Sequence, residues 1–367
     1  MNNRVYNNST LGIRLATGGE ARHNVVYSNG IGIEARFFAP LVAGNLVYAS
    51  DTAGLLASAG NPQFVNNTVF EPDGDAVRVD NGASNVHLRN NILWVESGYA
   101  VSVASGGRQG FQSDFNDLYA TDGGRIGFWQ GSDRPTLSAW RNATQNDQNS
   151  ISADPLFIDS DGLDNELGFV SEAQDGRDDD FHLRSPFGSF ERGQLAPTLD
   201  PAVLLPLVLP PIETAHGLVS PAIDRGDAGD PFENELLPSG GFINLGAYGN
   251  TSQASKSPLE YVLVLTPDGG ETWPVEQTFD VEWRSHDAEG DVDIELFQLS
   301  DLATPVLVIA DDADNDGHFA WQLPDTLPRA NDFIIRVTRH DLAIADQSDS
   351  PFTIADPINV YYVNDAS

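Results

Sequence analysis

The sequence contains no cysteine, a single lysine and no long hydrophobic run. Without cysteine, neither disulfide bonds nor thiolate metal sites can stabilise the fold. The longest apolar stretch, PAVLLPLVLPPI at residues 201–212, is too short and too interrupted by proline to span a bilayer. Residues 1–8 lack the charged and apolar segments of a secretion signal. We therefore expect no transmembrane segment within residues 1–367.

Positive charge is scarce as well. The 367 residues include 54 Asp and Glu but only 19 Lys and Arg, which gives a formal net charge of -35. Nucleic acids and anionic membranes would be repelled by such a surface, so we expect no nucleic-acid partner. Cations and uncharged polymers remain possible partners.

A short phrase recurs along the first third of the chain. The pattern Asn-x-aliphatic-aromatic begins at residues 3, 24, 45, 67, 91 and 116, and a second alternating strand follows nine or ten residues after each Asn. Self-similarity with a period near 22 residues is typical of a solenoid. Because period-2 alternation dominates and no window has a helical period, the repeated unit consists of short strands.

Three strands per repeat predict a parallel β-helix over residues 1–153. Asn tolerates the tight turns between strands, and stacked Asn amides can form hydrogen bonds along the axis. Alternation places the aliphatic residue of each phrase in the core and the next residue outside. We therefore expect an external column of stacked aromatic rings, formed by Tyr6, Tyr27, Tyr48, Phe70, Trp94 and Tyr119.

This aromatic column has two interpretations. Sugar rings stack on exposed aromatic faces, so the column is a candidate carbohydrate-binding surface. Stacked aromatic rings also stabilise a solenoid by packing on each other, and a loop that covered them would favour packing.

Two acidic loops are candidate calcium sites, although no cofactor is required by the sequence. The first contains Asp159, Asp161 and Asp164, and the second contains Asp312, Asp314 and Asp316 before Gly317. In the second loop, carboxylates at alternate positions resemble the first half of an EF-hand loop, but Leu323 stands where the bidentate Glu is expected. A polar hairpin turn is the favoured interpretation of the second loop, and a solvated acidic loop explains the first about as well as calcium binding does.

Residues 1 to about 256 resemble right-handed parallel β-helix repeat proteins, a group of mostly extracellular bacterial proteins. The phrases ADPLFIDSDGLDNELG, DDDFHLRSPFG and LGAYGN carry this resemblance. It implies that residues 154–256 form a C-terminal capping region with loop insertions.

Residues 257–356 resemble the small sandwich domain related to the yeast cell-wall Kre9/Knh1 family, through LTPDGGETWPVEQTFDVEWRS and DFIIRVT. Glu276 stands where similar domains often have glycine. Residues 357–367 (PINVYYVNDAS) resemble the start of a following β-helix, so we expect a piece of a longer repeat chain. The sequence thus predicts an all-β fold: a right-handed parallel β-helix with a C-terminal immunoglobulin-like β-sandwich.

The resemblances imply a non-catalytic structural or adhesive segment of an extracellular or cell-surface protein, with a polysaccharide or matrix glycan as a possible ligand. The alternative is a carbohydrate-active enzyme, namely a polysaccharide lyase, an epimerase or a glycoside hydrolase. Proton abstraction beside a carboxylate requires a base with neighbouring cations. The repeats contain no lysine, and no clustering is expected for Arg14, Arg78, His23 and His87.

Overall fold

The computed structural model describes residues 1–191, 202, 212–287, 290–340 and 344–357. The chain divides into two compact units, residues 1–258 and residues 259–367. The expected start of another β-helix at residues 357–367 lies outside the described residues, except for Pro357.

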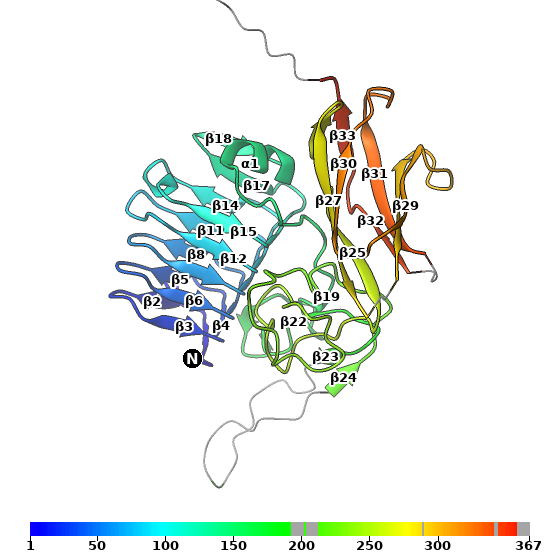
Figure 1. Cartoon of the computed structure of the whole chain (residues 1–367). Coiled ribbons are helices and arrows are strands. Elements are labelled where there is room, and N and C mark those ends of the chain that lie inside the picture. Colours follow the sequence, from blue (N-terminus) through cyan, green and yellow to red (C-terminus); the bar gives the residue numbers. More distant parts are fainter. Residues whose placement is uncertain (192–201, 203–211, 288–289, 341–343, 358–367) are drawn as a thin grey trace, which may run out of the picture. The chain divides into compact units, whose positions relative to one another are not determined.

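The first unit begins with a solenoid of three parallel sheets, seen in Figure 1 as a stack of blue to cyan strands. Sheet A comprises β1 (Arg4–Tyr6), β4 (Val25–Tyr27), β7 (Leu46–Tyr48), β10 (Thr68–Glu71), β13 (Ile92–Val95) and β16 (Asp117–Ala120). Sheet B comprises β2 (Ile13–Leu15), β5 (Ile31–Ala35), β8 (Ala53–Ala57), β11 (Asp75–Val79), β14 (Tyr99–Val103), β17 (Arg125–Trp129) and the antiparallel β18 (Ser132–Arg134). Sheet C comprises β3 (Glu20–Arg22), β6 (Leu41–Ala43), β9 (Gln63–Val65), β12 (His87–Arg89) and β15 (Gln112–Asp114).

The predicted register is confirmed on sheets A and B. Val26 pairs with Val47, and Val77 pairs with both Leu55 and Val101. All these side chains are fully buried in one core that runs along the solenoid. Stacking coils of this kind pairs the backbone of each coil with its neighbours and encloses the aliphatic side chains.

The predicted Asn ladder is also present. The side-chain amides of Asn3, Asn24, Asn45, Asn67 and Asn91 each donate to the side-chain oxygen of the next Asn, at 2.8–3.0 Å. At the last coil the side-chain amide of Asn116 donates to Asp147 Oδ1 at 3.1 Å, where the earlier coils have another Asn. Helix α1 (Leu137–Thr144) places the fully buried Trp140 over the end of the core, where its Nε1 donates to Asp147 Oδ2 at 2.7 Å.

After α1 the chain forms a capping region of loops and short strands. The strands are β19 (Phe157–Asp159), β20 (Phe169–Ser171), β21 (Gln174–Asp175), β22 (Asp180–Leu183), β23 (Ser189–Glu191) and β24 (Ile212–Thr214). A short 3-10 helix, η1 (Gly106–Arg108), belongs to the coils and lies between β14 and β15. A second hydrophobic core joins this region to the outer face of sheet A. The capping region therefore covers the side of the solenoid.

The second unit is a β-sandwich. One sheet contains β25 (Tyr261–Thr266), β27 (Thr278–His286) and β30 (His318–Gln322). The other contains β26 (Thr272–Pro274), β28 (Val292–Gln298), β29 (Leu307–Ala313), β31 (Ala330–Arg339), β32 (Ala345–Gln347) and β33 (Phe352–Ala355). Their facing side chains form a separate core that includes Trp273 and Trp321. Glu276 has a φ of 65°, which is the left-handed conformation that glycine adopts most easily.

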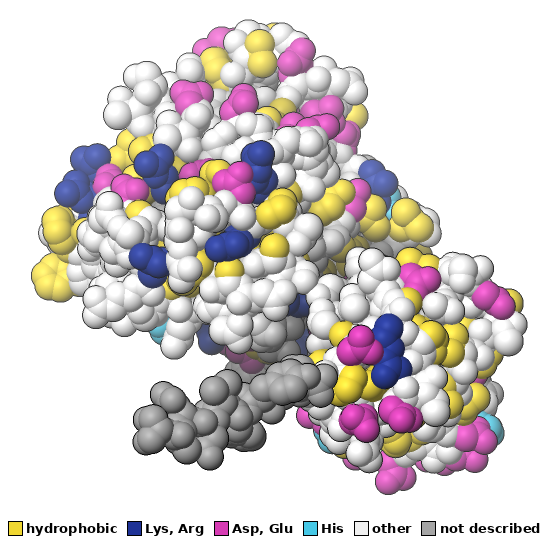
Figure 2. Space-filling view, turned by 90° about the horizontal axis from the view of Figure 1, so that it is seen from above, with side chains coloured by type: hydrophobic (Ala, Val, Ile, Leu, Met, Phe, Trp, Pro, Cys, Tyr) yellow, Lys and Arg dark blue, Asp and Glu magenta, His cyan; other side chains and the backbone are white. Residues whose placement is uncertain are grey.

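The all-β fold with a parallel β-helix and a β-sandwich is thus confirmed. The described part of the chain contains no helix long and apolar enough to cross a bilayer. On the face seen in Figure 2, acidic side chains are dispersed over both units instead of forming one patch.

Candidate functional site

The aromatic column exists, but its central rings are buried, and Tyr6 at its end is 37% exposed. Tyr6 stacks on Tyr27 and Tyr27 on Tyr48, each with ring centroids 5.0 Å apart, and Phe70 stacks on Trp94 at 4.2 Å. The side chains of Tyr27, Tyr48 and Phe70 are 0%, 0% and 5% exposed. The expectation of an exposed sugar platform is therefore wrong for these three rings.

The cover is the capping region. Phe181 packs against both Tyr48 and Phe70, with ring centroids at 4.8 and 6.1 Å, and Phe157 packs against Trp94 at 6.1 Å. Burial of large aromatic side chains is among the largest contributions to packing. The column thus serves as the base on which the capping region packs, which agrees with the packing interpretation.

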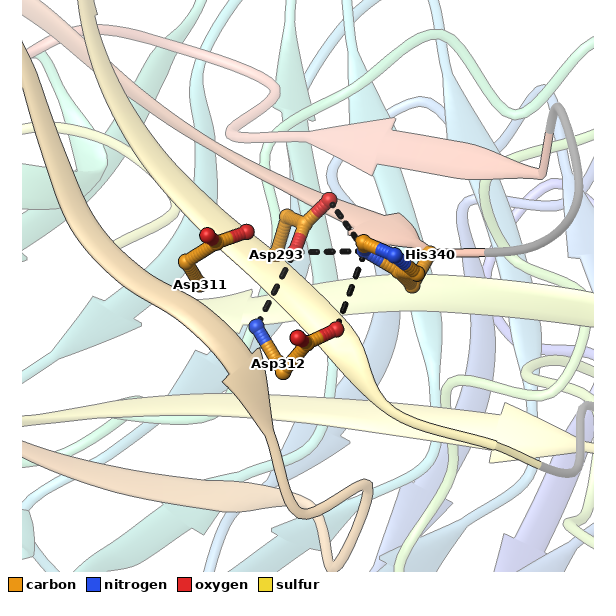
Figure 3. Close-up of side chains that lie close together, drawn as sticks. All are labelled: Asp293, Asp311, Asp312 and His340. Carbon is orange, nitrogen blue, oxygen red and sulfur yellow. Dashed lines mark hydrogen bonds and ion pairs between the residues drawn. The ribbon is translucent and has the colours of Figure 1, made fainter.

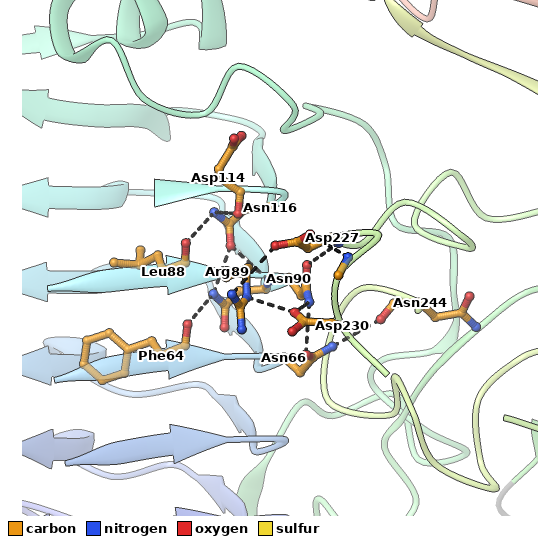
Figure 4. A network of polar contacts seen from close by, with 12 residues as sticks. Phe64, Asn66, Leu88, Arg89, Asn90, Asp114, Asn116, Asp227, Asp230 and Asn244 are labelled. Carbon is orange, nitrogen blue, oxygen red and sulfur yellow. Dashed lines mark hydrogen bonds and ion pairs between the residues drawn. The ribbon is translucent and has the colours of Figure 1, made fainter. Parts of the chain in front are cut away.

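Polar contacts fix the same interface. Tyr48 Oη donates to the backbone oxygen of Gly176 at 3.0 Å. Where the chain passes from β12 of sheet C to β13 of sheet A, Asn90 Nδ2 donates to Asp230 Oδ2 at 2.7 Å and Arg89 Nε lies 2.8 Å from the same oxygen (Figure 4). Arg89 also lies 3.7 Å from Asp227 Oδ2. These contacts join residues about 140 positions apart in the sequence.

In the first predicted acidic loop, two of the three candidate calcium ligands, Asp159 and Asp161, lie close together. Burial and the neighbouring Asp161 carboxyl raise the pKa of Asp159 above its ordinary value. Asp164 instead uses Oδ1 to accept from the backbone N–H of Glu166 at 3.0 Å, as in a polar turn. Asp159 and Asp161 therefore remain predicted calcium ligands, and Asp164 belongs to the turn.

The three candidate ligands of the second predicted loop lie in two different places. Asp314 and Asp316 lie in the turn between β29 and β30, where Asp316 Oδ1 accepts from His318 N at 3.1 Å. Asp312 instead gathers with Asp293, Asp311 and His340 (Figure 3). His340 Nδ1 lies 3.1 Å from Asp312 Oδ1 and 3.2 Å from Asp293 Oδ2. The loop thus forms the polar hairpin turn that the sequence favours, and the hairpin directs Asp312 towards Asp293 of β28, away from an EF-hand-like arrangement.

A groove of about 400 Å³ lies on the outer face of sheet C. The parallel register places Gln63, His87 and Gln112 in one row across three consecutive coils. The adjacent outward row contains Val65, Arg89 and Asp114. The groove is completed by Leu88, Ser113, Phe115, Gln145, Asn146, Asp147, Gln148 and Asp227.

The charged groups in this groove are held by neighbours. Arg89 is paired with Asp227 and Asp230, as described above. Burial raises the pKa of the Asp114 carboxyl above its ordinary value, although Asn149 donates to both of its oxygens at 2.8 Å. The groove thus offers several neutral amide groups beside a paired guanidinium, the partly buried carboxyl of Asp114 and the carboxyls of Asp147 and Asp227.

Such a lining suits a ligand rich in hydroxyl groups. Each amide of Gln63, Gln112 or Gln148 provides both donors and an acceptor, and Val65 and Phe115 provide apolar contact. Small-molecule sites usually combine apolar walls with a few polar groups that fix orientation. His87 also lies here with the carboxyls of Asp114, Asp147 and Asp227, and side chains of these two types can act in acid or base chemistry.

Sequence reasoning missed this groove. Comparing His87 only with Arg14, Arg78 and His23 did not reveal it, although the third strand of each coil continues the same register as the other two. Extending the repeat alignment to sheet C would have placed His87 beside Gln63 and Gln112. No local signal predicts the contribution of Asp227, which comes from the capping region.

Comparison with known families identifies both parts of the chain. Residues 1–118 match the family model described as right handed beta helix region, and residues 266–354 match the model described as Kre9/KNH-like N-terminal Ig-like domain. Among curated proteins and solved structures, no match was found. The solenoid and the sandwich predicted from the sequence agree with these assignments, so the chain combines a right-handed β-helix region with a Kre9/KNH-like Ig-like domain.

Proposed function

We propose that this chain is a non-catalytic adhesive and structural segment of an extracellular or cell-surface protein, which binds polysaccharide in the groove of sheet C. The observation that carries the proposal is the row of Gln63, His87 and Gln112 along the groove. Coils stack about 4.8 Å apart, so these side chains form a regular series of hydrogen-bonding groups along an extended ligand.

The surroundings support binding more than turnover. Arg89 is the groove's guanidinium, and its pairing with Asp227 and Asp230 leaves it poorly suited to neutralise a developing negative charge. The buried aromatic column and the Asn ladder support a rigid scaffold. The likeness of the Ig-like domain to a cell-wall family supports the extracellular or cell-surface location.

The alternative is a carbohydrate-active enzyme, such as a glycoside hydrolase or a polysaccharide lyase. It is favoured by one observation, the presence of His87 and the partly buried Asp114 in the same groove. Burial raises the pKa of the Asp114 carboxyl, which is the direction that a general acid requires.

The test is a polysaccharide array followed by calorimetric titration of each ligand found. The double variant Gln63→Ala/Gln112→Ala should bind at least tenfold more weakly than the wild type. The matched control, Arg78→Ala/Ser102→Ala, changes outward residues of neighbouring coils on sheet B and should bind as the wild type does. Absence of any polysaccharide binding by the wild type, or equal affinity of both double variants, would refute the proposal.

A further inference from the structure

Two adjacent phenylalanines protrude from the second coil of the solenoid. Phe37 and Phe38 lie in the turn between β5 and β6, and their side chains are 47% and 71% exposed. Both residues adopt the left-handed backbone conformation, with φ values of 56° and 54°. A bulky residue rarely adopts this conformation, and here two do so in succession.

The other coils show what this turn ordinarily contains. Counting from the paired residues Leu15, Ala35, Ala57, Val79 and Val103 places the same two turn positions in every coil. The residues there are Thr17–Gly18, Phe37–Phe38, Ala59–Gly60, Asn81–Gly82 and Ser105–Gly106. Four coils therefore have a small or polar residue followed by glycine, and only the second coil has two aromatic rings.

The backbone of the turn is held in place by the next coil. The N–H of Phe37 donates to Ala59 O at 3.0 Å, and Phe38 O accepts from Asn61 N at 2.8 Å. A Cβ on Gly60 would lie only 2.7 Å from Phe38 O, so the neighbouring coil requires glycine there for this close approach. In the other coils the first of these positions is not left-handed, and the second is left-handed only at Gly18 and Gly60, so two left-handed residues in succession are particular to the second coil among these five.

The two side chains cost the fold stability. A left-handed conformation costs a non-glycine residue roughly 1–2 kcal/mol. Because both rings are exposed, burial of their apolar surface offsets only a small part of this cost. The neighbouring turns contribute glycine, so no larger side chain from them covers Phe38. Backbone strain that is not offset by burial of the side chains often marks a functional site, so these two residues are candidates for binding.

We infer that Phe37 and Phe38 form a stacking site for a sugar ring of the bound polysaccharide. The inference rests on the proposed function and assigns the aromatic contact that the buried column does not provide. Sugar rings present flat C–H faces that pack on aromatic faces. The Arg36 guanidinium, 5.1 Å from the centre of the Phe37 ring, supplies hydrogen-bond donors for hydroxyl groups beside the rings.

Other occupants fit this surface less well. Two aromatic side chains bury at most about 500 Å², whereas each partner of a stable protein complex usually buries about 800 Å². The net charge of -35 opposes contact with an anionic membrane. A single neutral or cationic sugar ring matches both the size and the charge of the site.

The test is the double variant Phe37→Asn/Phe38→Gly, which introduces the residue types of Asn81 and Gly82, and both types tolerate the left-handed conformation. We expect its unfolding temperature to rise, because the strain is relieved, and its affinity for the polysaccharide bound by the wild type to fall at least tenfold. Phe38→Tyr should keep the affinity, and the control Leu163→Asn, which changes another highly exposed apolar residue, should leave it unchanged.

The outcomes separate this inference from the proposed function. If the wild type binds polysaccharide and the double variant binds it equally well, the stacking site is refuted while the groove proposal stands. If the double variant unfolds at a lower temperature, the rings are structural and the inference is wrong. Self-association of the wild type that the double variant loses would instead assign the rings to contact between copies. If the wild type binds no polysaccharide, both proposals fail.

Discussion

The side-chain oxygen of Asn91 accepts two hydrogen bonds from Asn67, one from the backbone N–H at 2.9 Å and one from the side-chain amide at 3.0 Å. Asn67 Nδ2 also donates to Val42 O at 2.9 Å, so one side chain joins three coils. Asn67 is fully buried, and water cannot replace these bonds.

Replacement of Asn67 by alanine should therefore be strongly destabilising. Each buried group left without a partner costs about 1–3 kcal/mol, so we expect Asn67→Ala to lower the free energy of unfolding by about 3 kcal/mol or more. Chemical denaturation measures this change. Asn142→Ala, at an exposed position of α1, is the control and should change the stability by less than about 0.5 kcal/mol. Equal effects of both variants would show that the ladder contributes nothing.

Phe181 should hold the capping region on the aromatic column. Its ring is fully buried and contacts Tyr48, Phe70 and Phe157. Truncation of such a ring costs about 3–5 kcal/mol, so Phe181→Ala should increase the rate of limited proteolysis within residues 154–256. The solenoid coils should stay resistant. The control Phe187→Ala changes a ring that is 41% exposed in the same region and should leave the rate unchanged. Unchanged cleavage of Phe181→Ala would contradict the assigned role of the column.

Stability should fall as the pH rises from about 5 to about 8. Burial raises the pKa of Asp179 to about 7 and that of Glu235 to about 8, and it raises the pKa of Glu71 well above its ordinary value. The folded state therefore binds these protons more tightly than the unfolded state. The resulting stability is complete below pH 4 and is lost as the pH passes through the folded pKa values.

Glu235→Gln isolates one of these groups. Its Oε1 would still accept from the N–H groups of Asn244 and Asn250, at 2.9 and 2.8 Å, without a titrating proton. Relative to the wild type, the variant should gain of the order of 3 kcal/mol in stability between pH 5 and pH 8. Urea denaturation at both pH values measures the difference. A constant difference between the two proteins would contradict a titrating Glu235.

Calcium binding by the first acidic loop stays a prediction. Asp159 and Asp161 repel each other when both are ionised, and a cation with oxygen ligands would relieve this repulsion. Millimolar Ca²⁺ should therefore raise the unfolding temperature of the wild type more than that of Asp159→Asn/Asp161→Asn. The control Asp314→Asn should respond as the wild type does. An equal response of all three proteins would exclude these ligands.

The coils were predictable because the information is periodic. Each Asn phrase fixes the position of Val69 or Leu93 in the core and of Phe70 or Trp94 outside it. The burial of the column was not predictable, because its cover includes Phe181, which follows Phe70 by more than one hundred residues without a repeated pattern.

The candidate sites show the same limit. The row of Gln63, His87 and Gln112 follows from the register of the coils and could be predicted from the sequence. The gathering of Asp312 with Asp293 and His340 depends on which strands of the sandwich are neighbours, and spacing within a single loop carries no such information. Charges that meet across strands therefore need the tertiary structure.

The most direct test of the proposed function is prolonged incubation of the protein with the polysaccharide that it binds, followed by measurement of new reducing ends and of ultraviolet absorbance from unsaturated products. Binding without turnover predicts that both signals stay at the level of the polysaccharide alone while the polysaccharide remains bound. Products that form with the wild type and disappear with Asp114→Asn, at unchanged affinity, would contradict this account and establish an enzyme.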